Sequence, residues 1–357
     1  MNRKKILYSL VLLVVLWVLS YVDAQGGFGG FGGRGMRGGG VPAENLRPVI
    51  IASKDIVQNC TPRWTGERLA DGRPNVSNEL IERLKHVSIT EAWSATNSGY
   101  PNSYTTGIGW TVMYPDEVIC GRVLTAQYMP SHPDYDAAIK LQGQKEGRIG
   151  DENSWPIDML QKGDVYVADG FGKIVDGTLI GDNLGNSIFA KSGNGVIFNA
   201  SVRDLEGLEE IEGFNAWYKG AHPSYLQRVM LMGINVPIRI GDAVACPGDI
   251  VLAKREGIVF IPAHMVEQVV TSSERTRVRD MFGHQRLKEG KYTPGQIDGA
   301  WTQEINADFG NWLKENADKI SKEQGIPKEI VEGMAGGSSG GGMPGGIMGG
   351  GALRGGN

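Results

Sequence analysis

Three charged residues at a distinctive spacing are the first candidates for chemistry in this sequence. Asp182 is followed, after twenty intervening residues, by the adjacent pair Arg203 and Asp204. An aspartate can hold a hard divalent cation such as Mg²⁺, which takes only one or two protein carboxylates and keeps several waters. An arginine offers planar, permanently charged donors that neutralise a developing enolate or alkoxide oxygen. The second acid, Asp182, would then orient a water near the cation or shuttle a proton.

A helix that begins beside Asp182 would complete such a site. Residues 183–192 read as a helix, and the N–H groups of Asn183, Leu184 and Gly185 at its start are free and lie at the positive end of its dipole. Such a helix start binds a carboxylate. Amides, guanidinium and cation together suit a 2-oxo acid, which presents both a carboxylate and a keto oxygen.

The lengths of the intervening elements explain how the three residues could meet. A helix of about ten residues runs ~15 Å at 1.5 Å per residue. The strand that starts at residues 196–198 and returns toward Arg203 covers ~20 Å over six or seven residues. The chain therefore comes back to the place where the helix began, and Asp182 can face the same pocket as Arg203 and Asp204.

Each of these residues also has a purely structural interpretation. An aspartate at a helix start commonly serves only as an N-cap. An Arg-Asp pair that opens a helix is commonly a surface ion pair. Spacing alone leaves both interpretations open.

Short strands alternate with helices through the middle of the chain, which predicts an α/β layered fold with a mixed sheet. After the strand at 165–169, the glycines around Phe171 predict a turn at 170–172. From 272 to 324 the chain is charged and aromatic, and an apolar stripe at helical spacing predicts a terminal helix that packs as a docking surface. The other expected helices are 75–86, 134–146, 205–211 and 263–271, the other expected strands are 118–129, 196–198, 229–232, 237–240, 250–252 and 258–261, and the stripe consists of Ile305, Phe309, Trp312 and Leu313.

The composition excludes several classes of function. Lys and Arg number 36 against 40 Asp and Glu, so the net charge of −4 leaves no basic excess and we expect no nucleic-acid partner. The 3 cysteines form no CxxC pair, and the 5 histidines form no HExxH motif. One disulfide is the most that the chain could form, and any metal should be held mainly by oxygen.

The two ends of the chain have compositions of their own. Three basic residues precede an apolar run at 6–19, and Val22-Asp23-Ala24 offers the small residues that a signal peptidase reads. The run is shorter than the ~20 residues that span a bilayer, so we expect cleavage after Ala24, no membrane span afterwards, and a periplasmic or secreted location. The expected divisions are a signal peptide (1–24), a glycine-rich segment (25–41), an α/β domain (42–271), a helical extension (272–333) and a glycine-rich tail (334–357).

The strand and glycine motifs resemble those of one family. The runs Gly181-Asp182-Asn183-Leu184, Gly195 to Asp204, and Pro247-Gly248-Asp249-Ile250 followed by Gly257 to Pro262 are similar to the class II aldolases for 4-hydroxy-4-methyl-2-oxoglutarate and 4-carboxy-4-hydroxy-2-oxoadipate, and to the related regulators of ribonuclease activity A. The likeness covers roughly residues 89–270. Aldolase members carry an acid, twenty residues, then Arg-Asp, and this sequence keeps that signature in full.

The resemblance implies a swivelling β/β/α fold in a trimer or dimer of trimers, and it assigns roles to the candidate residues. Arg203 would contact the keto oxygen and stabilise the pyruvate enolate. Asp204 would bind Mg²⁺, with Mn²⁺ as the alternative cation. Asp182 would position a water near the cation. The substrate-binding set would be Gly181, Asp182, Asn183, Leu184 and Arg203, with the backbone at Leu184 receiving the carboxylate. The implied reactions are retro-aldol cleavage that releases pyruvate and decarboxylation of oxaloacetate.

The sequence also departs from the family pattern. Where many members are acidic before the glycine at 257, this chain reads Ala253-Lys254-Arg255-Glu256, and the export signal and glycine-rich ends are unlike the compact cytosolic enzymes. Three functions therefore remain open: an exported metal-dependent lyase, a non-catalytic regulatory or binding protein on the same fold, and a structural component of the envelope.

Overall fold

The structure, a computed structural model, describes residues 42–336 of the chain. The expected signal peptide at 1–24, the glycine-rich segment at 25–41 and nearly all of the expected tail at 334–357 lie outside the described residues. Between residues 42 and 336, none of the helices combines the length and the apolar character that a bilayer crossing needs.

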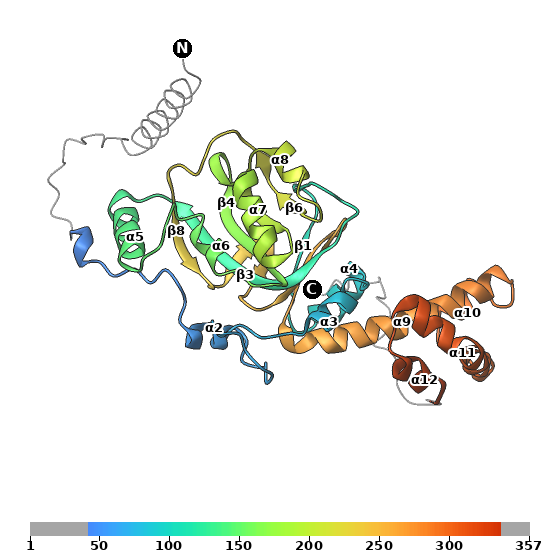
Figure 1. The fold of residues 1–357 in the computed structure, drawn as a ribbon. Coiled ribbons are helices and arrows are strands. Elements are labelled where there is room, and N and C mark those ends of the chain that lie inside the picture. Colours follow the sequence, from blue (N-terminus) through green and yellow to red (C-terminus); the bar gives the residue numbers. More distant parts are fainter. Residues whose placement is uncertain (1–41, 337–357) are drawn as a thin grey trace, which may run out of the picture. The chain divides into compact units, whose positions relative to one another are not determined.

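One mixed sheet organises the described residues, with the strand order β1-β12-β11-β3-β4-β5-β6-β2 and with β7 beside β5 and β8 beside β3. The neighbours β3, β4, β5 and β6 pair in parallel, whereas β8, β11, β12, β1 and β2 pair antiparallel with their partners. The predicted α/β class with a mixed sheet is confirmed (Figure 1). The strands are β1 (Tyr104–Thr106), β2 (Thr111–Val112), β3 (Ile119–Pro130), β4 (Asp164–Ile180), β5 (Val196–Val202), β6 (Ala216–Tyr218), β7 (Gly220–Ala221), β8 (Val229–Ile234), β11 (Ile250–Lys254) and β12 (Gly257–Ile261), and a separate pair consists of β9 (Ile238–Ile240) and β10 (Ala243–Ala245).

The helices fall before, between and after the strands. Those around the sheet are α2 (Lys54–Cys60), α3 (Asn78–Leu84), α4 (Ile89–Asn97), α5 (Pro133–Lys145), α6 (Trp155–Asp158), α7 (Asp182–Ser192) and α8 (Leu205–Glu209), with short 3-10 turns η1 (Ala43–Asn45) and η2 (Ala263–Met265). The predicted C-terminal extension is helical as expected, and it consists of the later part of α9 (Val266–Lys288) followed by α10 (Pro294–Asp298), α11 (Gln303–Gln324) and α12 (Lys328–Gly336).

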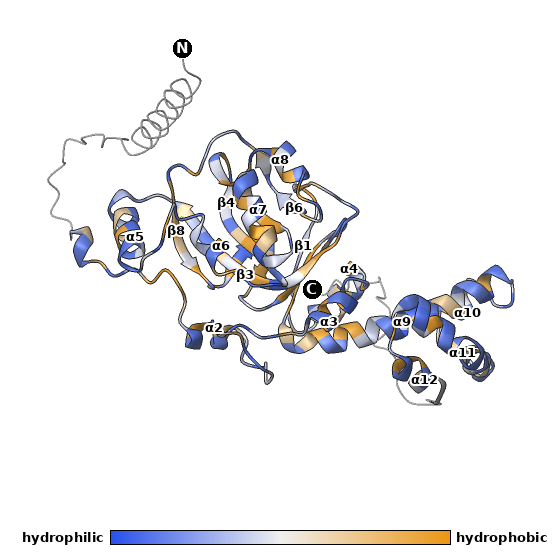
Figure 2. Cartoon of the chain, in the orientation of Figure 1, coloured by the Kyte–Doolittle hydropathy of each residue, from blue (hydrophilic) through white to orange (hydrophobic). Residues whose placement is uncertain are grey.

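Local sequence explains the central β4-α7-β5 unit. All residues of β5 are buried, which is typical of a strand covered on both faces. Helix α7 ends at Gly193, whose left-handed backbone (φ 68°) suits glycine as a helix terminator and confirms the predicted stop. Figure 2 shows hydrophobic residues following the strands, while α7 carries both hydrophobic and hydrophilic residues, as an amphipathic helix on a sheet must.

Two predicted boundaries were wrong. The turn expected at 170–172 does not end the strand: β4 continues to Ile180, with left-handed backbone at Phe171 and Gly172 and repeated register shifts against β5. These shifts let the strand bulge outward and then rejoin its neighbour. The helix expected to end at 271 continues as α9 to Lys288, because it also contributes Val278 and Phe282 to a second cluster of buried residues.

The apolar side chains divide into several cores. One face of the sheet packs Leu124, Tyr166, Phe198 and their neighbours against α5, α6 and α7. A second cluster joins β11 and β12 to α3, α4 and the start of α9. The predicted stripe of Ile305, Phe309, Trp312 and Leu313 is buried with Phe282 in the α9–α12 cluster, so it packs within the extension itself.

A buried ion pair fixes the segment before α3 to the sheet. The Arg73 side chain is 0% exposed, and its Nη2 donates to Asp164 Oδ2 at 2.8 Å. Asp164, the first residue of β4, is equally buried and also faces Arg122 Nε at 3.4 Å. Arg73 also pairs with Asp71 at 2.7 Å. A buried charge is tolerated only when it is paired in this way, so the position of the 71–73 segment is well determined.

Candidate functional site

The candidate site lies where two adjacent parallel strands end. β4 leads through Gly181 into α7, and β5 leads through Arg203 and Asp204 into α8 (Figure 1). The last pair in the register joins Ile180 to Val202, and the Arg203 N–H donates to the Ile180 carbonyl at 3.0 Å. The spacing of twenty residues therefore brings the two junctions side by side, as the helix-and-return geometry predicts.

Gly181 is the point of closest approach between the two junctions. A methyl group added at this residue would lie 2.3 Å from Asp204 Oδ2 and 3.0 Å from Arg203 Nε. The backbone of Gly181 is extended (φ −118°, ψ −165°), so its conformation is open to any residue. Glycine is required here because no other residue leaves room for the Arg203 and Asp204 side chains.

The start of α7 differs from the prediction by one residue. The N-cap is Gly181, and Asp182 is the first helical residue, so the N-cap interpretation of Asp182 is wrong. The Gly185 N–H, expected to be free, donates to the Gly181 carbonyl at 2.9 Å because the helix begins earlier. The Asn183 N–H donates to Asp182 Oδ1 at 2.8 Å. Within residues 42–336, the N–H of Leu184 makes no such hydrogen bond and remains the amide able to receive a carboxylate.

Arg203 and Asp204 form an ion pair with each other at the β5–α8 junction. Arg203 Nε donates to Asp204 Oδ2 at 3.1 Å, and their side chains are 40% and 47% exposed. A pair this exposed adds only about 0–1 kcal/mol to stability. Asp204 also adopts a left-handed backbone (φ 54°, ψ 50°), which is costly for an aspartate outside glycine-like turns. The surface ion-pair interpretation is thus correct for the geometry of Arg203 and Asp204.

A cavity of about 70 Å³ lies between the junctions. It is lined by Gly181, Asp182, Asn183, Leu184 and Arg203, which are the five residues predicted to bind substrate. Asp204 lies against Gly181 rather than in the lining itself. The cavity is also lined by residues that the sequence did not single out, namely Asn153, Thr178, Leu179, Ile180 and the exposed Tyr225.

Asp182 lies against α8, the short helix that follows Asp204. A methyl group added at Gly207, three residues after Asp204, would lie 2.7 Å from the Asp182 side chain. In the described part of the chain, no group of three or more His, Cys, Asp or Glu side chains could hold a metal. The protein would therefore supply at most the carboxylates of Asp204 and Asp182, which fits the one or two that Mg²⁺ takes from proteins.

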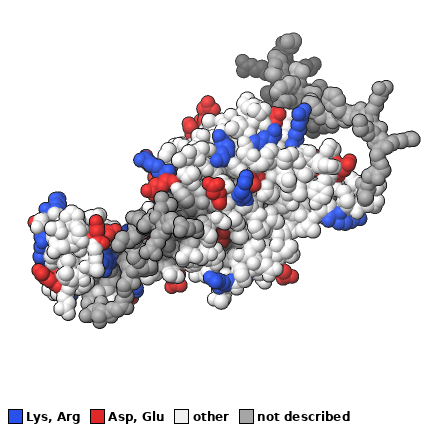
Figure 3. Space-filling view, turned by 180° about the vertical axis from the view of Figure 1, so that it is seen from behind, with Lys and Arg blue, Asp and Glu red and all other residues white. Residues whose placement is uncertain are grey.

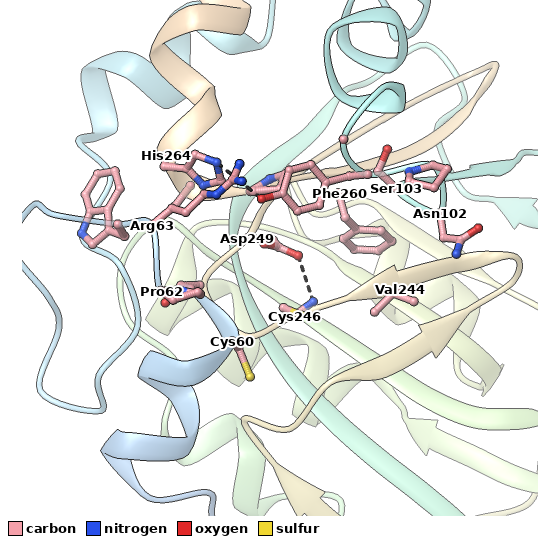
Figure 4. A pocket seen from close by; sticks show the side chains of 17 residues that line it. Cys60, Pro62, Arg63, Asn102, Ser103, Val244, Cys246, Asp249, Phe260 and His264 are labelled. Carbon is pink, nitrogen blue, oxygen red and sulfur yellow. Dashed lines mark hydrogen bonds between the residues drawn. The ribbon is translucent and has the colours of Figure 1, made fainter.

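A second, larger cavity of about 260 Å³ was not predicted. Aromatic, ionisable and cysteine side chains line it (Figure 4). They come from residues 60–64 after α2, from residues 99–103 after α4, and from the stretch between β10 and the residues that follow β12. Its buried Asp249 has a pKa raised to about 7 by burial, although the Cys246 N–H bonded to it opposes that rise. The sequence offered the Pro247-Gly248-Asp249 run only as part of a family motif, because its partners lie some 150 to 190 residues earlier in the chain.

Surface charge is mixed on the face turned away in Figure 1. Figure 3 shows Lys and Arg interspersed with Asp and Glu over the described residues of that face, with wide uncharged areas between them. This face therefore has no extended field of one sign that would track a phosphate backbone.

Comparison with known proteins finds similarity in the middle of the chain. Residues 90–260 match the model of the RraA-like family Aldolase/RraA. The chain is 26% identical over 163 residues to protein DlpA of Legionella pneumophila, a match that covers 45% of this chain and only 24% of DlpA. It is 26% identical over 118 residues to 4-hydroxy-4-methyl-2-oxoglutarate aldolase of Thermus thermophilus, covering 32% of this chain and 71% of that enzyme.

A solved structure supports the same fold. A crystal structure described as novel cellulases from microbes associated with the gut ecosystem aligns with a TM-score of 0.51 at 17% identity, over 64% of this chain and 94% of the other. Identity this low speaks for the fold alone. Residues 90–260, which match the RraA-like family model Aldolase/RraA, contain both the β4–α7 and the β5–α8 junctions.

Proposed function

We propose that this chain is an exported, divalent-cation-dependent lyase that cleaves or decarboxylates a 2-oxo acid through a pyruvate enolate. One observation carries the proposal: the residues expected to bind substrate line a single cavity at the ends of β4 and β5, with the Asp204 carboxylate against its Gly181 wall. The similarity to an enzyme named 4-hydroxy-4-methyl-2-oxoglutarate aldolase supports the same class of reaction.

Three residues of the cavity have a task in that reaction. The Leu184 N–H, at the positive end of α7, binds the substrate carboxylate. The Arg203 guanidinium donates to the keto oxygen. When the carbon–carbon bond breaks, its electron pair moves onto that oxygen as an enolate, and Arg203 stabilises the new charge. Asp182 orients the water that exchanges protons with the substrate hydroxyl and with the enolate carbon, which becomes the methyl group of pyruvate.

Asp204 would hold the cation and Asp182 would position a water near it, with Mg²⁺ as the first expectation and Mn²⁺ as the alternative. A bound divalent cation would draw electron density from the keto oxygen and so favour the enolate. The Arg203–Asp204 pair is half-exposed and weak, so releasing the guanidinium to substrate and the carboxylate to a cation costs little.

The first test is turnover by the purified chain. Wild type with Mg²⁺ should release pyruvate from oxaloacetate or from 4-hydroxy-4-methyl-2-oxoglutarate. The release is measured by the coupled reduction of pyruvate to lactate. Arg203→Ala should cost about 3 kcal/mol of transition-state stabilisation, or roughly 150-fold in kcat/KM. Asp204→Asn should raise the Mg²⁺ concentration needed for half-maximal activity at least about tenfold, because it removes the anionic ligand.

A matched control comes from a second exposed ion pair. Arg255 pairs with Asp116, neither residue lines the cavity, and the two side chains are 71% and 82% exposed. Arg255→Ala should leave kcat/KM unchanged. Wild-type turnover by Arg203→Ala would contradict the role assigned to that residue.

The alternative function is a non-catalytic regulatory or binding protein on the same fold. The mutual pairing of Arg203 and Asp204 favours this reading, because both groups have a partner before any ligand arrives. Absence of turnover with either acid, with Mg²⁺ or with Mn²⁺, would support it. The trimeric or hexameric state and the export are parts of the proposal with their own measurements, which are light scattering of the purified chain and N-terminal sequencing of the secreted form.

A further inference from the structure

Two of the three cysteines line the 260 Å³ cavity. Cys60 is the last residue of α2, and Cys246 directly follows β10, so 185 residues separate them in the sequence. Both side chains line the cavity and both are partly exposed (Figure 4). The third cysteine, Cys120, is fully buried within β3, and its Sγ lies 3.7 Å from the Ile81 carbonyl.

The two thiols influence each other's acidity. The Cys60 S–H donates to the Ile56 carbonyl at 3.3 Å. The neighbouring Cys246 side chain lowers the pKa of Cys60, and Cys60 in turn raises the pKa of Cys246. Burial and the nearby Asp249 carboxylate raise both values, and they do not cancel the effect at Cys60. Cys60 is thus the better nucleophile of the pair.

Packing holds the two residues in place independently of each other. Val57 anchors α2 with a fully buried side chain, and Arg68 fixes Thr61 by donating to its Oγ1 at 2.8 Å and to its carbonyl at 2.9 Å. The turn that contains Cys246 is also held by packing. A methyl group added at Gly248 would lie 2.3 Å from Pro74, so this turn packs closely against the segment between α2 and α3. The fold itself therefore places both cysteines beside the cavity.

We propose that Cys60 and Cys246 form a thiol–disulfide switch that joins the α2 segment to the β10–β11 turn across one wall of this cavity. The oxidant is a disulfide donor such as oxidised glutathione. The Cys60 thiolate attacks one sulfur of the donor, a mixed disulfide forms, and one donor thiolate leaves. Cys246 then loses its proton and attacks the Cys60 sulfur, and the second donor thiolate leaves. Two protein thiols and one donor disulfide become one protein disulfide and two donor thiols.

Oxidation has a structural consequence at the cavity. In the reduced chain Cys60 and Cys246 are free, so no covalent bond joins α2 to the β10–β11 turn. In the oxidised chain a covalent bond closes a loop that contains most of the sheet, which restricts the unfolded state and fixes one side of the cavity. A ligand of this cavity would then meet a wall whose rigidity depends on the redox state.

The experiment counts thiols in the full chain. After equilibration with either reduced or oxidised glutathione, the protein is acid-quenched, unfolded and alkylated with a maleimide. The reduced sample should carry three labels per chain and the oxidised sample one, on Cys120, with a Cys60–Cys246 cross-linked peptide after proteolysis. Three labels in the oxidised sample, or cross-links between chains or to Cys120, would overturn the proposal.

Single variants separate the two roles. Cys246→Ser should trap a mixed disulfide between Cys60 and glutathione, because the resolving thiol is missing, whereas Cys120→Ser should still form the Cys60–Cys246 bond. In wild type, the rate of iodoacetamide alkylation of Cys60 should rise with pH at a lower midpoint than in Cys246→Ala, which has no side-chain donor beside Cys60. Equal midpoints would refute Cys60 as the activated thiol. Circular dichroism confirms that each variant is folded before it is scored.

Discussion

The substitution Gly181→Ala tests the geometry of the candidate site without removing any of its charged groups. The added methyl group would lie 2.3 Å from Asp204 Oδ2, whereas ordinary contact begins at 3.4 Å, so that carboxylate must retreat by about 1 Å. Arg203 Nε, at 3.0 Å, must yield as well. Alanine adopts the extended backbone of Gly181 without strain, so the fold should be retained.

A displacement of about 1 Å in a catalytic group costs on the order of 100-fold, or roughly 2.7 kcal/mol. We therefore expect kcat/KM for pyruvate release by Gly181→Ala to fall about 100-fold, with a Tm close to that of wild type. The control is Gly310→Ala on α11, where a methyl group meets nothing within 4 Å. It should keep full activity and gain about 0.5–1 kcal/mol of stability. An active Gly181→Ala beside an inactive Arg203→Ala would refute the view that the position of the pair matters.

Two further predictions concern stability. Arg73→Met leaves the buried Asp164 without its closest partner, and it should reduce the free energy of unfolding, measured in urea, by about 3–5 kcal/mol. The exposed Arg255→Met should reduce it by about 0.5 kcal/mol or less. Equal losses in the two variants would show that burial of the ion pair is irrelevant. Burial raises the pKa of Asp249 to about 7, far above its unfolded value of ~4, so the folded state binds this proton more tightly. That contribution is complete below pH ~4 and is lost as the pH rises through about 7. Asp249→Asn should therefore raise Tm relative to wild type by more at pH 8 than at pH 5, and a constant difference would contradict the shifted pKa.

The β4-α7-β5-α8 unit was predictable because its signals are local. The apolar runs of β4 and β5 and the stop at Gly193 can be read from neighbouring residues, and strand pairing then brings Asp182 near Arg203. The left-handed backbone at Asp204 was not predictable, because no local signal demands it from an aspartate. It is imposed by the need to leave the end of β5 and enter α8 beside Gly181.

The parts that the sequence could not supply depend on contacts between distant segments. The continuation of β4 past Gly172 depends on pairing of its outer part with β5, and the meeting of Cys60 with Cys246 depends on how the α2 segment is fixed to the sheet. Periodicity and turn residues describe only neighbours along the chain. Contacts of this range follow from the packing of the whole sheet.

Helix α9 belongs to two hydrophobic clusters at once. Val266, Val269 and Val270 pack with the sheet-side helices, while Val278 and Phe282 pack with α11 and α12. The helix contains no proline, and no glycine before Gly283, so it lacks the usual points at which a helix bends. A displacement of α11 and α12 is thus transmitted along α9 to the sheet-side helices. Amide exchange at residues 272–277, which lie between the two clusters, should therefore report on the integrity of both.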